Sequence, residues 1–198
     1  MKNIVMMAVA TLMATMSANA QHREGDNTLQ PRVGITMSTL TDTEGSKMKI
    51  NMVGGLELEH FFTEEFSVAG GALFTKQGTK FDDGTKLNIF YCVIPLTANY
   101  YVLPGLAVKA GVQPGYRMKS NVETDEGKID IDRFLEVLFD EGDIKMPKFD
   151  LSIPIGLSYE YSGVTLDVRY NLGLTKVLTG TGESVRNQVI AMTLGYKF

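Results

Sequence analysis

Two neighbouring stretches of the chain alternate apolar and polar residues without a break, and this alternation limits the possible fold more than any other feature. In FDLSIPIGLSYEY (149–161) every second residue is apolar, and the same holds in VTLDVRYNLGLTK (164–176). Because successive side chains of a β-strand point to opposite faces, each stretch predicts a strand with one apolar and one polar face. Ser162 and Gly163 between them predict a tight turn.

The same alternation recurs along the chain and predicts eight strands. We expect them near residues 31–39, 50–62, 66–77, 87–102, 105–119, 149–161, 164–175 and 187–198. Tight turns are expected at 63–65, 103–105 and 162–163. Long loops are expected at 40–49, 78–86, 120–148 and 176–186. This order predicts an all-β fold, an eight-stranded antiparallel up-and-down barrel with both chain ends at the short-turn end.

The first residues carry the pattern of a secretory signal peptide. Lys2 precedes an apolar stretch, residues 4–16, and the segment ends in an Ala-Asn-Ala sequence at Ala20. This pattern predicts export and cleavage after Ala20. A retained membrane anchor is the alternative, but a spanning helix needs about 20 apolar residues. We therefore expect a signal peptide at 1–20, an N-terminal tail at 21–30 and a barrel domain at 31–198.

Two kinds of barrel fit this pattern: a soluble ligand carrier with an apolar interior, and an outer-membrane barrel with its apolar rows facing lipid. Aromatic residues favour the second, because they gather near both ends of the apolar rows, as the girdles of membrane barrels do. One band would hold Phe62, Phe66, Tyr100, Tyr159, Tyr161, Tyr196 and Phe198. The other would hold Phe74, Phe90, Tyr116, Phe149 and Tyr170.

Length and composition also favour the membrane barrel. The row 149–161 would extend about 43 Å and, tilted by about 40°, rise about 33 Å, which suffices for an apolar band and both girdles. The polar rows are rich in Gly, Ser, Thr and Asn and sparse in charge, unlike a surface that faces water. We therefore expect a transmembrane barrel in the outer membrane, with short periplasmic turns and long extracellular loops.

The polar rows carry charged residues that would fill the lumen. An eight-stranded barrel is only wide enough for its own inward side chains, and charges in such a space must be paired. We expect a network of Glu57, Glu59, Lys109, Arg117, Asp150, Glu160, Asp167 and Arg169. Arg117 should pair with Asp150, and Arg169 should collect carboxylates at mid-height. A closed scaffold is the leading hypothesis, and a narrow pore or small-ligand-binding barrel is the alternative.

The segment 121–143 holds nine acidic residues and predicts a long surface loop. It does not fit a calcium-binding EF-hand loop, because Arg133 stands where that loop needs a glutamate. Apolar residues recur within it at helical spacing and predict a short amphipathic helix. They are Ile131, Phe134, Leu135 and Leu138. This helix would either cap the barrel mouth or contact a partner.

The sequence shows no arrangement typical of an enzyme. His22 falls in the N-terminal tail and His60 near the short-turn end, so neither is expected beside a nucleophile at the long-loop rim. Cys92 is the single cysteine, which excludes an internal disulfide, and no metal-ligand spacing is present. We expect no catalytic residue, metal or cofactor. The net charge of −4, or −5 once Lys2 is removed, also disfavours a nucleic-acid partner.

Three prolines fall inside expected strands, where a proline cannot donate a hydrogen bond to the neighbouring strand. Pro95, Pro114 and Pro154 are each expected to mark a bulge or a locally missing bond.

Several stretches resemble the PorT-like outer-membrane β-barrel proteins of Bacteroidota. IFYCVIPLTANYY (89–101) resembles that family's YLEIPL…KYY strand, and DLSIPIGLSYEY with VTLDVRYNLGLTKV resembles its next hairpin, including the RYxxGL signature. TLGYKF (193–198) is similar to its last strand. Val93 departs from the pattern because the family often has an acidic residue there, and Cys92 stands where leucine is common.

The resemblance implies an outer-membrane location and contact with membrane lipid. It also implies that the C-terminal Phe198 is presented to the barrel assembly machinery. The family includes a component implicated in type IX secretion, although many members have no assigned activity, so a partner protein of the cell envelope is implied as well. Fold and location follow from such a resemblance more directly than function does.

Overall fold

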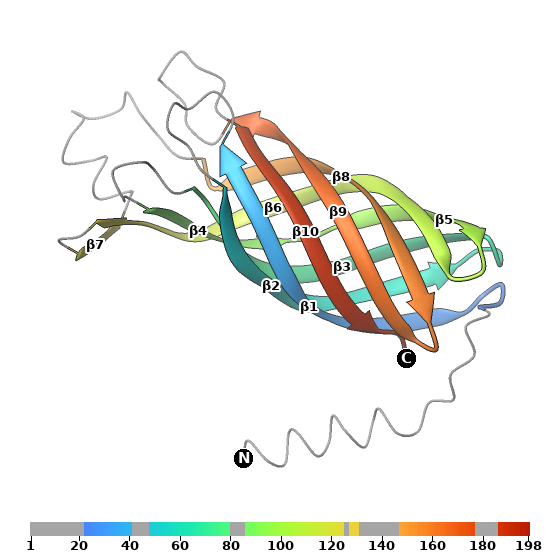
Figure 1. The fold of residues 1–198 in the computed structure, drawn as a ribbon. Coiled ribbons are helices and arrows are strands. Elements are labelled where there is room, and N and C mark those ends of the chain that lie inside the picture. The colour runs from blue at the N-terminus through green and yellow to red at the C-terminus, as the bar shows by residue number, and fades with distance from the viewer. Residues whose placement is uncertain (1–21, 41–47, 80–85, 125–126, 131–146, 177–185) are drawn as a thin grey trace.

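The computed structural model describes residues 22–40, 48–79, 86–124, 127–130, 147–176 and 186–198. These ranges form strands β1 (Asn27–Leu40), β2 (Lys49–Phe61), β3 (Phe66–Gln77), β4 (Lys86–Val93), β5 (Leu96–Leu103), β6 (Leu106–Thr124), β7 (Gly127–Asp130), β8 (Phe149–Tyr161), β9 (Val164–Lys176) and β10 (Arg186–Tyr196). Figure 1 shows long tilted strands around one axis, with the short turns at one end. No helix in the described part of the chain is long and apolar enough to cross a membrane.

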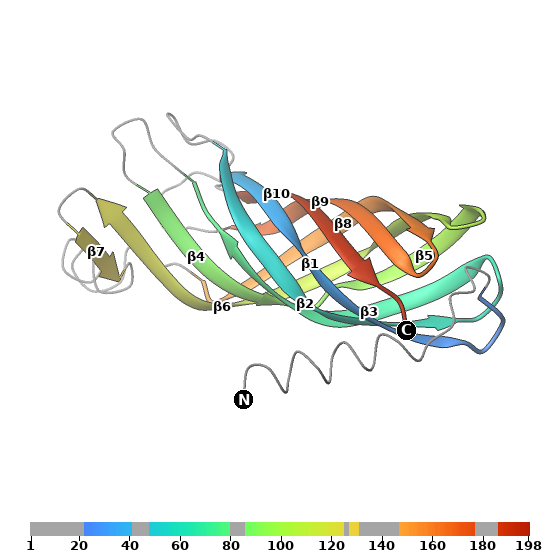
Figure 2. The same ribbon diagram turned by 60° about the horizontal axis from the view of Figure 1, so that its bottom comes forward.

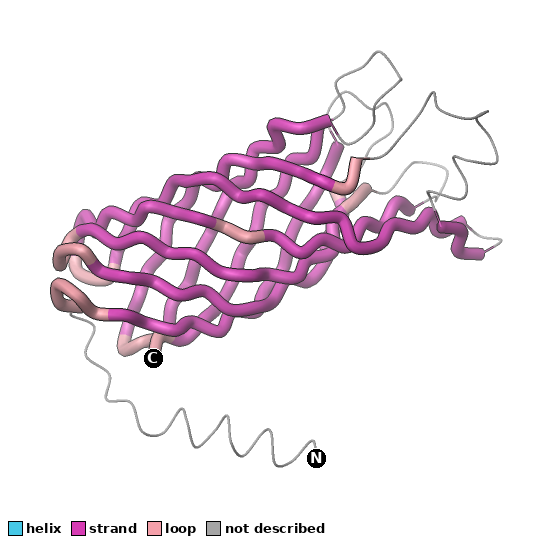
Figure 3. The backbone as a smooth tube through the Cα atoms, turned by 180° about the vertical axis from the view of Figure 1, so that it is seen from behind, coloured by secondary structure: helices cyan, strands magenta, loops and turns pink. Residues whose placement is uncertain are grey.

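The sheet closes on itself. Each strand of the wall pairs antiparallel with its neighbours, and β1 pairs with β10, where Arg32 lies opposite Gly195. The backbones of Leu29 and Phe198 continue this seam by exchanging hydrogen bonds of 3.2 and 3.0 Å. One position of the wall, between β3 and β6, is occupied by β4 and β5 in succession (Figure 3). β7 pairs with β6 alone and is not part of the wall, so the wall has eight strand positions. The predicted eight-stranded antiparallel barrel is confirmed.

The apolar rows face outward and the polar rows face the lumen. On β9, Leu166 is 49% exposed, whereas the side chains of Asp167 and Arg169 on the opposite face are buried. The same division holds on β2, where Leu58 is exposed and Glu57 and Glu59 are buried. The exterior is therefore apolar, as in a membrane barrel and unlike a carrier with an apolar pocket.

The two predicted aromatic bands lie on this exterior. Phe62, Phe66, Tyr100, Tyr159 and Tyr161 are exposed near the short turns, and Phe74, Tyr116, Phe149 and Tyr170 are exposed toward the other end. Aliphatic residues such as Leu157 and Leu166 lie exposed between the bands. This order of side chains matches a bilayer with an interface on each side of its hydrocarbon core.

Several strand boundaries differ from those expected. β1 begins at Asn27 and not at residue 31, so part of the expected tail belongs to the wall. β6 runs to Thr124 and folds back into β7, which makes the first part of the expected 121–143 loop a β-hairpin. Figure 2 shows this hairpin projecting beyond the wall. The expected helix around 131–138 lies outside the described residues.

The prolines interrupt the ladder as predicted, although the strands keep their register. Pro95 lies in the break between β4 and β5, where the amide of Ile94 donates to the carbonyl of Pro114 at 2.8 Å. Between β6 and β8, Ala110 pairs with Ile155 and Gln113 with Ser152, but the two positions between them are unpaired. Pro154 lies in this gap. Because a proline has no N–H to donate, it explains why the pairing is lost there.

The outward face of β8 allows a test of membrane burial. Ile155 is 53% exposed and lies midway between Phe149 and Tyr161, at the two ends of the strand. We expect Ile155→Arg to lower the free energy of unfolding in lipid vesicles by about 2–4 kcal/mol, and Tyr161→Arg, near the interface, by about 0–1 kcal/mol. Urea titration followed by the mobility of unheated protein on SDS gels measures both. Equal costs at the two positions would contradict a membrane-embedded wall.

Candidate functional site: the charged lumen

At mid-height five charged side chains meet inside the barrel, and we call them the middle cluster: Arg32, Glu57, Lys109, Asp167 and Arg169. Glu57 lies between two arginines, with its oxygens 2.7 Å from Nε of Arg32 and 2.6 Å from Nη1 of Arg169. Asp167 contacts Nη1 of Arg32 at 3.0 Å, Nζ of Lys109 at 3.1 Å and Nε of Arg169 at 2.7 Å. Arg169 also donates from Nη2 to Glu57 at 2.9 Å, so this pair is bidentate.

Glycines on neighbouring strands make room for these long side chains. Gly71 lies opposite Glu57, Gly156 opposite Arg169 and Gly195 opposite Arg32. A Cβ atom at Gly71 would lie 2.7 Å from Cγ of Glu57, and one at Gly195 would lie 3.1 Å from Cγ of Arg32. Larger residues at these inward positions would therefore collide with the strand backbone and with the cluster.

A second group closes the short-turn end, and we call it the short-turn cluster: His22, Glu59, Tyr101, Glu160 and Lys197. Nζ of Lys197 lies 2.9 Å from Glu59 and 2.8 Å from Glu160, and it donates to the hydroxyl of Tyr101 at 2.7 Å. Nε2 of His22 lies 3.0 Å from both carboxylate oxygens of Glu160. The cluster thereby joins the segment before β1 to the residue that follows β10.

Aromatic rings and polar side chains complete this second group. The His22 ring stacks on Phe61 at 4.2 Å, and Nζ of Lys197 lies 5.3 Å from the ring centres of Phe61 and Tyr101. Ser67 and Asn99 donate to Glu59 at 2.5 and 2.8 Å. Burial opposes the charge on Lys197, but Glu59 and Glu160 overcome this effect and raise the pKa of its ammonium above the ordinary value. Lys197 therefore stays cationic.

The two clusters together balance their charges. Four cations, Arg32, Lys109, Arg169 and Lys197, face four carboxylates, Glu57, Glu59, Glu160 and Asp167. All eight are buried. Because each charge has an opposite charge within about 3 Å, the interior avoids the large cost of an unpaired charge in a dry space.

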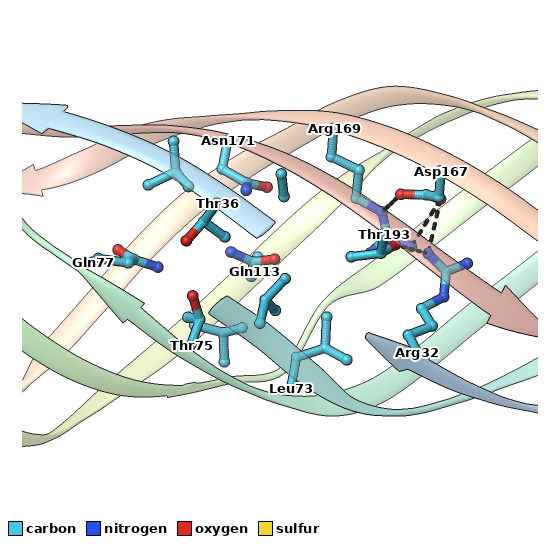
Figure 4. A pocket seen from close by; sticks show the side chains of 14 residues that line it. Arg32, Thr36, Leu73, Thr75, Gln77, Gln113, Asp167, Arg169, Asn171 and Thr193 are labelled. Carbon is cyan, nitrogen blue, oxygen red and sulfur yellow. Dashed lines mark hydrogen bonds and ion pairs between the residues drawn. The ribbon is translucent and has the colours of Figure 1, made fainter. Parts of the chain in front are cut away.

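The middle cluster lies beside a cavity of only about 20 Å³. Figure 4 shows Arg32, Asp167, Arg169 and Thr193 on one side of it, with Thr36, Thr75, Gln77, Gln113 and Asn171 on the other. Valine, leucine and alanine side chains narrow the space further: Val53, Leu73, Val93, Val189 and Ala191. Such a volume is close to the minimum needed for a single water molecule.

Six of the eight expected lumen residues are brought together in these clusters: Glu57, Glu59, Lys109, Glu160, Asp167 and Arg169. Arg117 and Asp150 lie elsewhere and have separate partners instead of forming the expected pair. Arg117 donates to Ser120 at 2.5 Å and to the carbonyl of Pro147 at 3.3 Å. The carboxylate of Asp150 accepts a hydrogen bond from Thr175.

Four members of the clusters were missed by sequence reasoning: His22, Arg32, Tyr101 and Lys197. Arg32 and Lys197 carried a usable signal, because each stands between outward apolar residues: Val33 follows Arg32, and Tyr196 and Phe198 flank Lys197. His22 precedes the first strand, where no alternation indicates the direction of a side chain. Its place in the lumen depends on the chain turning back at Gly25, which has a φ of 87°.

The described residues show no other arrangement with evident chemistry. In those ranges, no group of three His, Cys, Asp or Glu side chains could hold a metal ion. Nδ1 of His60 donates a hydrogen bond to Oδ1 of Asn27 at 2.9 Å, and the His60 ring packs edge-on against Phe62, at the short-turn interface. Cys92 lies on the outer face, paired across the sheet with Phe74 and Tyr116.

Loss of Arg169 provides a test of the middle cluster. Arg169→Ala leaves Glu57 and Asp167 with fewer cations, and removing one partner of a buried ion pair costs about 3–5 kcal/mol. We expect the free energy of unfolding in lipid vesicles to fall by this amount. Lys128→Ala is the control, because β7 lies outside the wall and a surface change costs less than about 0.5 kcal/mol. An unchanged urea midpoint for Arg169→Ala would show that the cluster contributes nothing to stability.

Comparison with known proteins places the chain in a family. No curated protein sequence matches it. Among solved structures, the attachment invasion locus protein Ail of Yersinia pestis, bound to the heparin analogue sucrose octasulfate, is similar with a TM-score of 0.52 and 13% identity. That match covers 87% of this chain and 99% of Ail. Neisserial surface protein A has a TM-score of 0.55 and 11% identity, covering 92% of this chain and 100% of that protein.

These structural matches establish a shared fold, because their identities are low. The sequence itself matches the family described as outer membrane protein beta-barrel domain over residues 19–179. This match covers most of the chain and is broader than the PorT-like group, which it does not single out. With its closed wall, apolar exterior and charged interior, the chain belongs to the outer membrane protein beta-barrel domain family and is a protein of the outer membrane.

Proposed function

We propose that this protein is a non-enzymatic, non-conducting barrel that presents its long loops at the cell surface to a partner of the cell envelope. The observation that carries this proposal is the closed lumen. Two clusters of buried ion pairs cross it at different heights, and the cavity beside the middle cluster is about 20 Å³.

A plugged lumen favours a scaffold over the alternative of a pore or a small-ligand-binding barrel. An ion that passed through would have to separate Glu57 from Arg169 and Lys197 from Glu160, which lie at 2.6 and 2.8 Å. Opening buried pairs of this kind costs several kcal/mol for each group. A bound organic ligand would also need pockets of about 300 Å³ or more. A cavity of about 310 Å³ reaches this size, but it lies at the short-turn rim and not beside the middle cluster. It is lined by turn residues such as Glu64 and Pro104, together with His22 and Tyr101.

At the long-loop end, a strand of the wall extends beyond the barrel. β6 continues beyond the wall to Thr124, where it pairs with β7 on one side and with Lys86 to Asn88 of β4 on the other. Its neighbour β5 ends in a tight turn at the opposite rim, where Gly105 has a φ of 79°. Surface loops on a rigid scaffold are common sites of binding, so we place the contact with a partner here.

Within this end, the segment 131–138 is our candidate contact. Its apolar residues at helical spacing are Ile131, Phe134, Leu135 and Leu138. An exposed apolar stripe is costly without a partner, and the surrounding acidic residues would keep it in solution until one binds. We place short turns in the periplasm and long loops outside, with Phe198 as the signal read during assembly. A role in type IX secretion would agree with the PorT-like resemblance.

Planar bilayer recordings test the closed lumen. We expect the purified protein to show no steady unitary conductance, because no continuous wet path crosses the two clusters. A porin incorporated from the same detergent is the positive control for insertion, and gel mobility of the unheated sample confirms folding. Reproducible unitary steps from the unmutated protein would refute the plug and favour the pore.

Substitutions in the candidate contact test the scaffold role. We expect replacement of Ile131, Phe134, Leu135 and Leu138 by serine to abolish capture of a specific envelope partner from outer-membrane extract, with folding unchanged. A control replaces Asp132 and Glu136 of the same segment, and Asp140 just after it, by serine. Capture should persist in this control, since it keeps the apolar stripe. Identical capture by both variants and the wild type would exclude the stripe as the contact.

A further inference from the structure

The outer wall carries an uncharged aromatic residue between two lysines at the long-loop end. Lys76 of β3 lies opposite Phe90 of β4, and Phe90 lies opposite Lys119 of β6. The three residues therefore form one row across three adjacent strands, which we call the lysine row. Lys76 and Lys119 are exposed on the outer face, and Phe90 is half-buried between them.

The side chains of Lys76 and Lys119 have no protein partner among the described residues. In contrast to the lumen cations, Lys76 and Lys119 make no ion pair or side-chain hydrogen bond within the described part of the chain. Only the backbone carbonyl of Lys76 accepts hydrogen bonds, from Thr36 and Thr75. Lys148, just before β8, adds another exposed cation beside β6, where its carbonyl accepts from the amide of Arg117 at 2.7 Å.

An apolar, mainly aromatic row lies next to the lysine row, two residues along β3 and β4 toward the middle of the barrel. Phe74 is opposite Cys92, Cys92 is opposite Tyr116, and Tyr116 is opposite Phe149. The rings of Phe74 and Phe90 are stacked, with their centres 6.4 Å apart. This row belongs to the aromatic band that marks the bilayer interface, so the lysine ammonium groups stand at the level of the lipid headgroups.

The charge at this level is opposite to that at the short-turn rim. There the exposed or half-buried charged residues of the tail and of the β2–β3 turn are mostly acidic: Arg23, Glu24, Asp26, Glu64 and Glu65. A basic site over an aromatic surface is thus specific to the long-loop side among the described residues. It suits a ligand that has both an anionic head and apolar chains.

We propose that the lysine row and the apolar row below it form a binding site for the phosphate group of an outer-leaflet glycolipid. Adjacent strands lie about 4.8 Å apart, so the backbones of Lys76 and Lys119 are about 10 Å apart, and both flexible side chains can reach one phosphate above Phe90. The acyl chains would then pack on Phe74, Phe90 and Tyr116. The outer-leaflet assignment rests on the orientation given under the proposed function.

Lipid retention tests this site. Wild-type protein is incubated in neutral detergent with lipid A that carries two phosphates, and bound lipid is counted by native mass spectrometry. We expect occupancy at least fivefold higher for the wild type than for the Lys76→Glu/Lys119→Glu variant. Lys76→Arg/Lys119→Arg should retain the lipid, because both cations remain. Arg23→Glu/Lys128→Glu is the matched control with the same change in net charge and should behave as the wild type.

Three further probes separate the possible sources of phosphate. Dephosphorylated lipid A should bind at least fivefold less than lipid A, and neither phosphatidylglycerol nor inorganic phosphate at equal concentration should displace lipid A. Displacement by either one would overturn the glycolipid assignment. Equal retention by the wild type and the Lys76→Glu/Lys119→Glu variant would overturn the site. So would the absence of any retained lipid A on the wild type. External protease digestion of intact cells tests the orientation separately, so that failure of the site and failure of the topology can be told apart.

Discussion

The need to pair every backbone N–H and C=O group inside hydrocarbon governs the rest of this structure. A sheet with free edges cannot satisfy that need in lipid, and only closure removes the edges. The seam between β1 and β10 provides the closure, from Leu40 opposite Asn187 down to Leu29 opposite Phe198. Once the wall is closed, the apolar rows must face lipid, and every polar row is confined to a narrow lumen.

Confinement of the polar rows explains the two charged clusters. An eight-stranded wall leaves space for side chains alone, so charges that point inward have no bulk water and must find one another. Arginine suits the centre because its guanidinium contacts two carboxylates at once, as Arg169 does with Glu57 and Asp167. Lysine suits the rim, where Lys197 accommodates two carboxylates and a tyrosine around one ammonium. The plug is therefore a consequence of closure with charged inward rows, and it directs function toward the loops and the outer surface.

The inward and outward cations of the wall have different surroundings. The inward cations of the two clusters are neutralised by carboxylates of the protein, whereas Lys76 and Lys119 on the outward rows have no side-chain partner among the described residues. The alternation of side chains along a strand separates these two classes of cation, because residues that differ by one position face opposite sides of the wall. On β6, Arg117 faces inward, and after the bulge opposite Phe90 and Tyr91, Lys119 faces outward. An irregularity of one residue thus determines which charge can meet a lipid.

Alternation in the sequence by itself determined the class of fold, the direction of each row and six lumen charges, since the period of two depends only on local strand geometry. It did not determine which charges touch. Arg117 and Asp150 lie at similar heights but have different partners, and this depends on stagger between strands that no local pattern records. The lumen position of His22 and the meeting of Lys197 with Glu59 and Glu160 likewise follow from closure, which brings the two ends of the chain together. Tertiary structure alone decided these contacts, because they join residues far apart in sequence whose distance is set by the circumference and tilt of the closed sheet.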